Sequence, residues 1–228
     1  MAMLSGCQQA EEFENLNEEL VLSIEADIEK PVESRYANAN GNETPNGLKF
    51  VSGDKIGVFM DNKAVTEWTK SESDSWDTMS GSVYWPDKSS VPHNFYAFYP
   101  YPTETSEFSK EDVPMPSLEG QTGTIASLSA CDFMVATAHS AYNDYNGKVS
   151  FMGEKNCFKH VSSLVAITIL KESDLVNSTV NYISFEAIDL ASSRTYSFEN
   201  IQNPIKFTPT GVKSAIKSDE LNLSMANE

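Results

Sequence analysis

Short apolar stretches, about ten in number and most of them bounded by glycine, proline, asparagine or serine, follow one another along the 228-residue chain. Stretches of this kind are typical of β-strands, and the residues that bound them are typical of turns. Among them we predict a strand on each side of a tight turn at Gly53-Asp54, and a hairpin turn at Asn146-Gly147. No amphipathic pattern of about twelve residues or more predicts a helix. The sequence therefore predicts an all-β fold, a sandwich or a barrel-like structure, with long surface loops.

The first predicted strand covers residues 20–28. Its polar positions alternate with an apolar row made of Leu20, Leu22, Ile24, Ala26 and Ile28. A helical period that starts at Phe13 also exists, but the five apolar positions at a period of two favour a strand.

An aromatic strand is predicted at 93–99, within a ten-residue stretch that holds five aromatic side chains. Phe95 shares one face with Tyr99, and Phe98 lies on the other. Because both faces are apolar, we predict a central strand that is covered on both sides and contributes to the core, not a sugar-binding platform.

Three aromatic residues in or beside predicted loops are better candidates for ligand contact. Trp68 and Trp76 lie in a Ser-rich segment, residues 61–81, that is predicted to be a long surface loop, and Tyr101 follows the aromatic strand. A glycan-binding surface protein that uses Trp68, Trp76 and Tyr101 is therefore the alternative function.

Charge and motifs exclude several classes of function. The chain has 33 acidic and 16 basic residues and a net charge of −17, which argues against nucleic-acid binding. It contains no apolar run of about 18 residues that would span a membrane. No nucleotide-binding, serine-hydrolase or zinc-protease motif occurs, and no carboxylate pair stands out for glycoside hydrolysis. We expect no enzymatic activity.

Metal binding and disulfide formation are not expected either. Cys157 and His160 have the spacing of two metal ligands, but no second pair completes a site. Cys131 and Cys157 would be able to pair in an exported protein, although two separate buried thiols are favoured. We therefore predict no metal and no cofactor.

The N-terminus contains a lipoprotein-type motif. Residues 4–7, Leu-Ser-Gly-Cys, fit a bacterial lipobox, in which Cys7 becomes the acylated residue. An apolar segment of a signal peptide would be expected before it, and only Met-Ala-Met stands there. We expect the native protein to be lipidated at Cys7, with that apolar segment lost from this chain.

Four motifs in order resemble those of one bacterial family, the fimbrillin-like (Mfa-like) lipoproteins of the Bacteroides group. The motifs are FVSGDKIGVF (50–59), YWPDKSSVPHNFYAFYPY (84–101), DFMVATA (132–138) and FKHVSSLVAITI (158–169). The resemblance covers roughly residues 20–210, and the lipobox at residues 4–7 also fits the N-terminus of that family. It implies a transthyretin-like β-sandwich of Greek-key type.

The family resemblance also implies a function. It implies a subunit, anchor or tip adhesin of a type V pilus, located at the outer membrane as a surface lipoprotein or in a fimbrium. Its partners would be other fimbrial subunits, joined by β-strand exchange, and a host or bacterial surface protein or glycan. The only membrane contact expected is through the N-terminal lipid.

Strand exchange in this family follows a proteolytic cut after an arginine. Arg35 is the candidate here, because a cut there would release strand 20–28 and the lipid together. The alternatives are that Arg35 is an ordinary surface residue and that an uncut subunit acts as an anchor.

We expect a tether over residues 1–19, one sandwich domain over 20–213, and a tail or the start of a second domain over 214–228.

A modification site is the last candidate. Asp77-Thr78-Met79 matches the three-residue pattern for O-glycosylation in exported proteins of this bacterial group, with Thr78 as the acceptor. The pattern is short and occurs often by chance.

Overall fold

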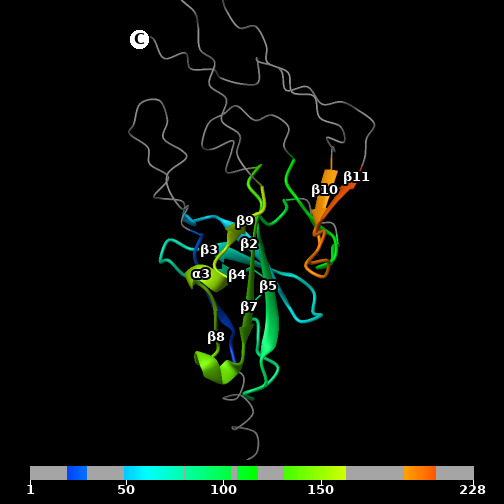
Figure 1. Cartoon of the computed structure of the whole chain (residues 1–228). Helices are drawn as coiled ribbons and strands as arrows, with labels where there is room; N and C mark the ends of the chain where they lie inside the picture. The colour runs from blue at the N-terminus through cyan, green and yellow to red at the C-terminus, as the bar shows by residue number, and fades with distance from the viewer. Residues whose placement is uncertain are drawn as a thin grey trace, which may run out of the picture. The chain divides into compact units, whose positions relative to one another are not determined.

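The computed structural model describes residues 20–29, 49–79, 81–103, 107–117, 131–162 and 193–208 (Figure 1). Almost all regular structure in these ranges is β-strand, with one helical turn, η1 (Tyr142–Asp144), and one short helix, α3 (Gly153–Asn156). The all-β prediction is therefore confirmed. The predicted lipidation site Cys7, the predicted cleavage site Arg35 and the tail 214–228 lie outside the described residues.

Chain contacts divide the protein into two compact units. The first unit takes in the N-terminal strand and residues 48–98 and 136–159. It contains most of a six-stranded sheet, in the order β4-β3-β2-β5-β7-β9. The strands are β4 (Trp76–Thr78), β3 (Thr66–Lys70), β2 (Lys55–Met60), β5 (His93–Tyr99), β7 (Met134–Ser140) and β9 (Lys159–His160).

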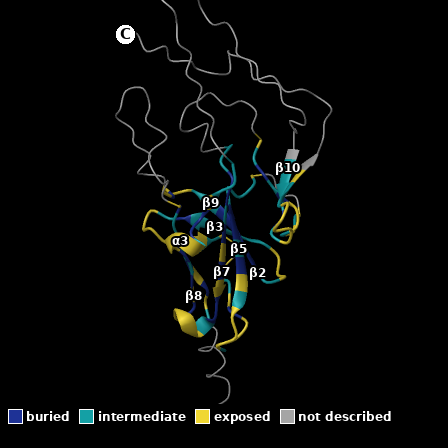
Figure 2. Cartoon of the chain, viewed as in Figure 1, coloured by how far each residue is buried: buried dark blue, intermediate teal, exposed yellow. Residues whose placement is uncertain are grey.

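The aromatic strand β5 lies at the centre of this sheet, between β2 and β7. Phe95 and Ala97 on one face and Phe98 on the other are all fully buried, which confirms the prediction of a strand covered on both sides. Figure 2 shows this burial along the middle of β5, with one exposed residue, Asn94, near its start. The stretch contributes to the core, as its two apolar faces require.

A glycine makes room for one of these rings. Gly57 of β2 is paired with Phe98 of β5 in antiparallel register. A Cβ atom at Gly57 would lie 2.2 Å from Cζ of Phe98, so the ring lies directly over the glycine. Phe59 is next to Phe98, with ring centroids 5.9 Å apart. The second glycine of the sequence F-x-x-G-D-K-I-G-V, Gly57, is therefore needed so that the Phe98 ring can pack on this face of the sheet.

A second, smaller sheet of the first unit pairs β1 (Ser23–Ala26) with β8 (Lys148–Phe151) in parallel. Aromatic contacts connect its residues to those of the large sheet. Phe151 of β8 contacts Phe158, which contacts Phe50, which in turn contacts Trp76 of β4. The two sheets therefore form the layers of a sandwich around a shared aromatic core.

The second unit contains a three-stranded antiparallel sheet in the order β11-β10-β6. The strands are β6 (Val113–Pro114), β10 (Ser193–Tyr196) and β11 (Ile205–Thr208). Ring contacts from Tyr196 to Phe133 and to Phe198 pack this sheet. Burial raises the pKa of the Tyr196 hydroxyl, as expected inside an aromatic cluster.

Three local predictions were wrong. Residues 61–81 are not one long loop, because they contain strands β3 and β4. The described residues before Gly53 form no strand. Asn146 and Gly147 do form a turn with positive φ angles of 50° and 79°, but the strands on either side, β7 and β8, belong to different sheets and form no hairpin. No helix in the described part of the chain is long and apolar enough to cross a membrane.

The close approach of Phe98 to Gly57 predicts the effect of adding one methyl group. Gly57→Ala should lower the free energy of unfolding by about 1–3 kcal/mol, because the ring must move within a packed face. Urea denaturation measures this loss.

The matched control is a double-mutant cycle with Phe98→Leu, which removes the ring. In that background Gly57→Ala should cost less, with a coupling of about 0.5 kcal/mol or more. Additive effects of the two substitutions would show that the clash is not with Phe98.

Candidate functional site: the N-terminal strand and its groove

The backbone of the segment 20–28, which contains β1, is hydrogen-bonded to neighbours on both sides. Towards β8, the ladder is extended at both ends by bonds from Ser23 N to Gly147 O (3.1 Å) and from Asp27 N to Phe151 O (3.0 Å). On the opposite side, Leu22 donates to Val83 O at 2.8 Å. The segment 20–28 therefore lies between two segments that are far from it in the sequence, and the place that it occupies is called the groove below.

The residues on either side of β1 also pair with other segments. Trp85 N donates to Leu20 O at 2.9 Å, in an antiparallel bridge that pairs Val21 with Tyr84. At the other end, Ile28 forms a parallel bridge with Phe158. The whole predicted strand 20–28 is thus engaged, although regular strand geometry is limited to four residues.

One face of this segment belongs to the core. Leu22, Ile24 and Ile28 are buried, with exposures of 4%, 6% and 7%. Leu20 and Ala26, the other two members of the predicted apolar row, are half-buried. The predicted period of two is confirmed by this burial.

The outer face fixes the register of the strand. Glu25 is paired with Ser150 across the ladder, and its Oε2 atom lies 3.3 Å from Nζ of Lys148. The hydrogen bond from Ser150 and the contacts with Lys148 outweigh burial and lower the pKa of Glu25. A one-residue slip would break these contacts and turn the apolar row outward.

A single carbonyl group organises the start of the groove. Gly147 O accepts hydrogen bonds from Ser23 N and from the indole Nε1 of Trp85, the latter at 2.8 Å. The Trp85 ring, 2% exposed, also packs edge-on against Phe95 and Tyr142. Sequence reasoning recognised Trp85 only as part of a motif, and it identified Gly147 only as a turn residue. It did not show that both hold the N-terminal strand.

The dependence between β1 and β8 is mutual. In the part of the chain that the structure describes, β8 has no ladder partner except β1. If β1 left, β8 would present an unpaired edge and the buried side chains Val149 and Phe151 would face an empty groove.

The predicted ligand-contact tryptophans do not lie at the surface. Trp68 and Trp76 are only 3% and 5% exposed, so neither indole offers a face to a ligand in this structure. Trp76 packs against Phe50, and the buried Lys70 ammonium lies 5.3 Å above its ring. The error follows from taking 61–81 as a loop, because strands β3 and β4 turn their indoles into the core.

Other predicted residues lie apart from the groove. Thr78 is half-exposed at the end of β4, and its hydroxyl donates a hydrogen bond to Gly81 O.

Cys131 and Cys157 are both free, as the sequence favoured. Burial raises the pKa of both thiols, which keeps them protonated near neutral pH.

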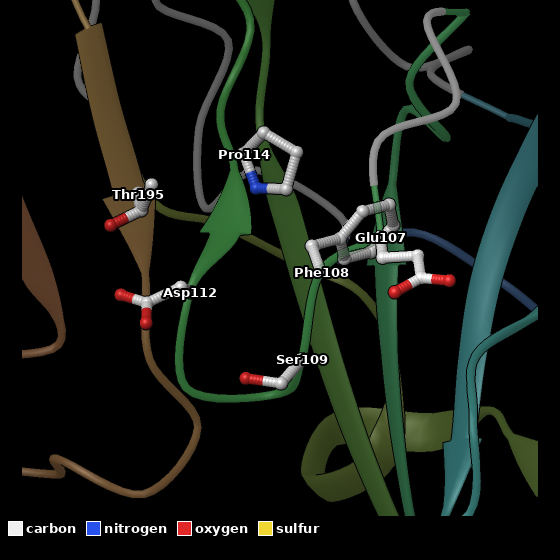
Figure 3. A pocket seen from close by; sticks show the side chains of 6 residues that line it. All are labelled: Glu107, Phe108, Ser109, Asp112, Pro114 and Thr195. Carbon is white, nitrogen blue, oxygen red and sulfur yellow. The ribbon is translucent and has the colours of Figure 1, made fainter.

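Tyr101 belongs to the second unit and lies beside an open cavity. Its ring centroid is 6.1 Å from that of Phe108. The cavity encloses about 590 Å³ and is lined by Glu107, Phe108, Ser109, Asp112, Pro114 and Thr195 (Figure 3). No group of three potential metal-binding residues occurs among the described residues.

The fold and the groove define an all-β protein whose N-terminal strand completes a sheet of the first unit. A family model described as fimbrillin-like matches residues 37–223. The chain belongs to this fimbrillin-like family. The family supports a role as a fimbrial or adhesin subunit at the cell surface. No curated protein matches the chain significantly.

Solved structures of candidate cell adhesion proteins from three Bacteroides species resemble the chain. The Bacteroides ovatus protein is 16% identical with a TM-score of 0.48, and the match covers 86% of this chain and 71% of that protein. The Bacteroides uniformis protein is 16% identical, with a TM-score of 0.49 and coverages of 87% and 70%. The Bacteroides thetaiotaomicron protein is 14% identical, with a TM-score of 0.39 and coverages of 87% and 68%. Similarities this low carry no argument about function.

The contacts of Glu25 predict a pH dependence. A lowered folded-state pKa stabilises the fold when the carboxylate is charged. The contribution is complete above the ordinary Glu pKa of 4.5 and is lost as the pH falls through the lower folded value. Because the pair is largely exposed, Glu25→Gln should cost less than about 1 kcal/mol at pH 7.

Urea denaturation of both proteins between pH 7 and pH 3 tests this. The difference between the native protein and Glu25→Gln should shrink as the solution becomes more acidic. The exposed residue Glu72 provides the control, Glu72→Gln. A difference for Glu25→Gln that stays constant with pH would contradict the assignment.

Proposed function

We propose that the protein is a cell-surface fimbrial subunit, or the anchor or tip adhesin of a fimbrium, and that it joins other subunits by exchange of its N-terminal strand. The observation that carries the proposal is that β1 is the only ladder partner of β8 among the described residues. A strand near the chain's start that completes a sheet is the element that a partner's strand would replace.

The energetics favour exchange with a similar strand over a permanently open groove. Leu22, Ile24 and Ile28 contribute roughly 1.5–3 kcal/mol each when buried. Backbone hydrogen bonds on both sides add to this and do not depend on sequence. An incoming strand with apolar residues at every second position would recover both terms.

Maturation at Arg35 would make the exchange irreversible. A cut after Arg35 would separate Cys7, with its lipid, and strand 20–28 from the rest of the chain. The mature subunit would then be free to enter a polymer. A subunit that escaped the cut would stay attached to the outer membrane through Cys7 and would serve as an anchor.

An arginine-specific protease tests the exchange on the folded protein. The chain has only two arginines, Arg35 and Arg194. Arg194 is half-buried in β10 and donates to Pro116 O, so the native fold should protect it. Cleavage should therefore occur at Arg35, and a labelled peptide of residues 20–29 added in excess should enter the cut protein.

Two peptide variants with the same new side chain provide the matched control. Ile24→Gln places an amide on the buried face and should weaken incorporation at least ~10-fold, because a buried polar group loses its water. Ser23→Gln changes the exposed face and should leave incorporation unchanged. Equal incorporation of both peptides, or incorporation into uncleaved Arg35→Gln protein, would refute strand exchange.

We also propose Thr78 as an O-glycosylation acceptor. Thr78→Val keeps the shape of the side chain and removes the hydroxyl, so the intact mass should fall by the mass of the glycan in a host that modifies this motif. Asp77→Asn should have the same effect, because it breaks the motif. An unchanged mass in both variants would exclude modification at Thr78.

A further inference from the structure

We infer that the cavity of the second unit is a binding site for a neutral saccharide. The cavity is made by the segment 107–114 and by Thr195 of β10. Figure 3 shows the labelled side chains arranged around an open space, with ring carbons from Phe108 and Pro114 and oxygen atoms from Glu107, Ser109, Asp112 and Thr195. The inference does not depend on strand exchange, because none of these residues belongs to the groove.

The wall of the cavity is held in place by its own hydrogen bonds. Ser109 closes the turn, because its Oγ accepts from Glu111 N (3.2 Å) and its carbonyl accepts from Asp112 N (3.1 Å). Lys206 of β11 donates to Glu111 O and forms an ion pair of 2.7 Å with Asp112. A preformed wall of this kind lowers the cost of ordering on binding.

Further contacts tie the same segment to the β10–β11 sheet and the turn that follows β10. Lys110 forms an ion pair of 2.9 Å with Glu199, and its carbonyl accepts from Phe198 N at 2.8 Å. Thr195 is opposite Pro114 in the antiparallel register of β10 and β6. The residues of the cavity are therefore fixed relative to one another by the sheet of the second unit.

The chemistry of the wall matches a sugar ring. Phe108 is half-buried and packs against Tyr101, which supports its ring from within the unit. An aromatic ring of this kind provides a surface for the C–H face of a pyranose. Carboxylate oxygens of Glu107 accept from sugar hydroxyls. The Ser109 hydroxyl, whose oxygen already accepts from a backbone N–H, has a proton to donate to a ligand oxygen.

Size and charge narrow the ligand class. A volume of about 590 Å³ lies within the range of small-ligand sites, ~300–1,000 Å³. The carboxylate of Glu107 is exposed, whereas the ion pair with Lys206 offsets the charge of Asp112. The whole chain adds to the negative charge, with a net charge of −17. An anionic saccharide would be repelled, so the site fits a neutral one.

The test is a titration of the full chain with saccharides of defined charge, followed by NMR or calorimetry. The neutral probes are methyl glycosides of glucose, galactose, mannose and N-acetylglucosamine, together with their β-linked disaccharides. At least one should bind with a Kd of about 10 mM or tighter. A sialylated lactose and a sulfated galactose serve as anionic probes and should not bind. Calcium chloride alone should produce no saturable change.

Two substitutions place the binding in the cavity. Phe108→Ala should weaken the neutral saccharide at least ~10-fold, because it removes the stacking surface. Glu107→Ala should weaken it about 3–10-fold and should leave the fold intact, since the side chain is exposed. The controls Tyr145→Ala and Glu72→Ala remove an exposed aromatic ring and an exposed carboxylate in the first unit, and they should change nothing.

The inference would be overturned by any of three results. They are the absence of binding by every neutral probe, binding by the anionic probes or calcium alone, and an affinity that Glu107→Ala leaves unchanged. A thermal melt of each variant separates loss of binding from loss of folding. Because the strand-exchange experiment probes only the groove in the first unit, its outcome and this one are distinguishable.

Discussion

The parallel ladder between β1 and β8 is the interaction on which the small sheet of the first unit depends. β8 has no other strand partner in the described ranges, and the residues that flank β1, Val21 and Ile28, form only isolated bridges to other segments. The carbonyl of Gly147 joins this ladder to Trp85 and thereby to β5 at the centre of the large sheet. The small sheet is therefore complete only while a strand pairs with β8, because without one the buried side chains Val149 and Phe151 would lose their cover.

The sequence predicted most strands because their physical signals are local. The alternation in 20–28 and the two apolar faces of β5 determine burial within a few residues, and the structure confirms both. Which strands pair and which side chains touch depends instead on residues that are distant in the sequence. The sequence of residues 146–147 does not distinguish a hairpin from a turn between two sheets. The residues around Gly57 likewise do not indicate that the ring of Phe98 packs over this glycine.

The candidate ligand residues show the same limit. Trp68 and Trp76 lie among serines and acidic residues, which suggested a solvent-facing loop. The polar neighbours instead occupy the outer positions of β3 and β4 and the turn between them, where Ser71, Ser73 and Ser75 hydrogen-bond to one another. Of the three residues predicted to contact a ligand, only Tyr101 lies beside a cavity. Phe108 was missed because its segment has no periodic pattern, and the cavity depends on a pairing with β10 that is about 80 residues distant in sequence.

The parallel direction of β1 on β8 has a consequence for any polymer built from this chain. A donor strand that reproduces the native register, with Ser23 opposite Lys148 and Ala26 opposite Phe151, must enter the groove with the same direction. Every junction would then join different surfaces of two neighbouring subunits, which is a heterologous contact that does not close into a symmetric pair. Such a filament has two unlike ends, so one end can be attached to the cell while the other binds a surface outside it.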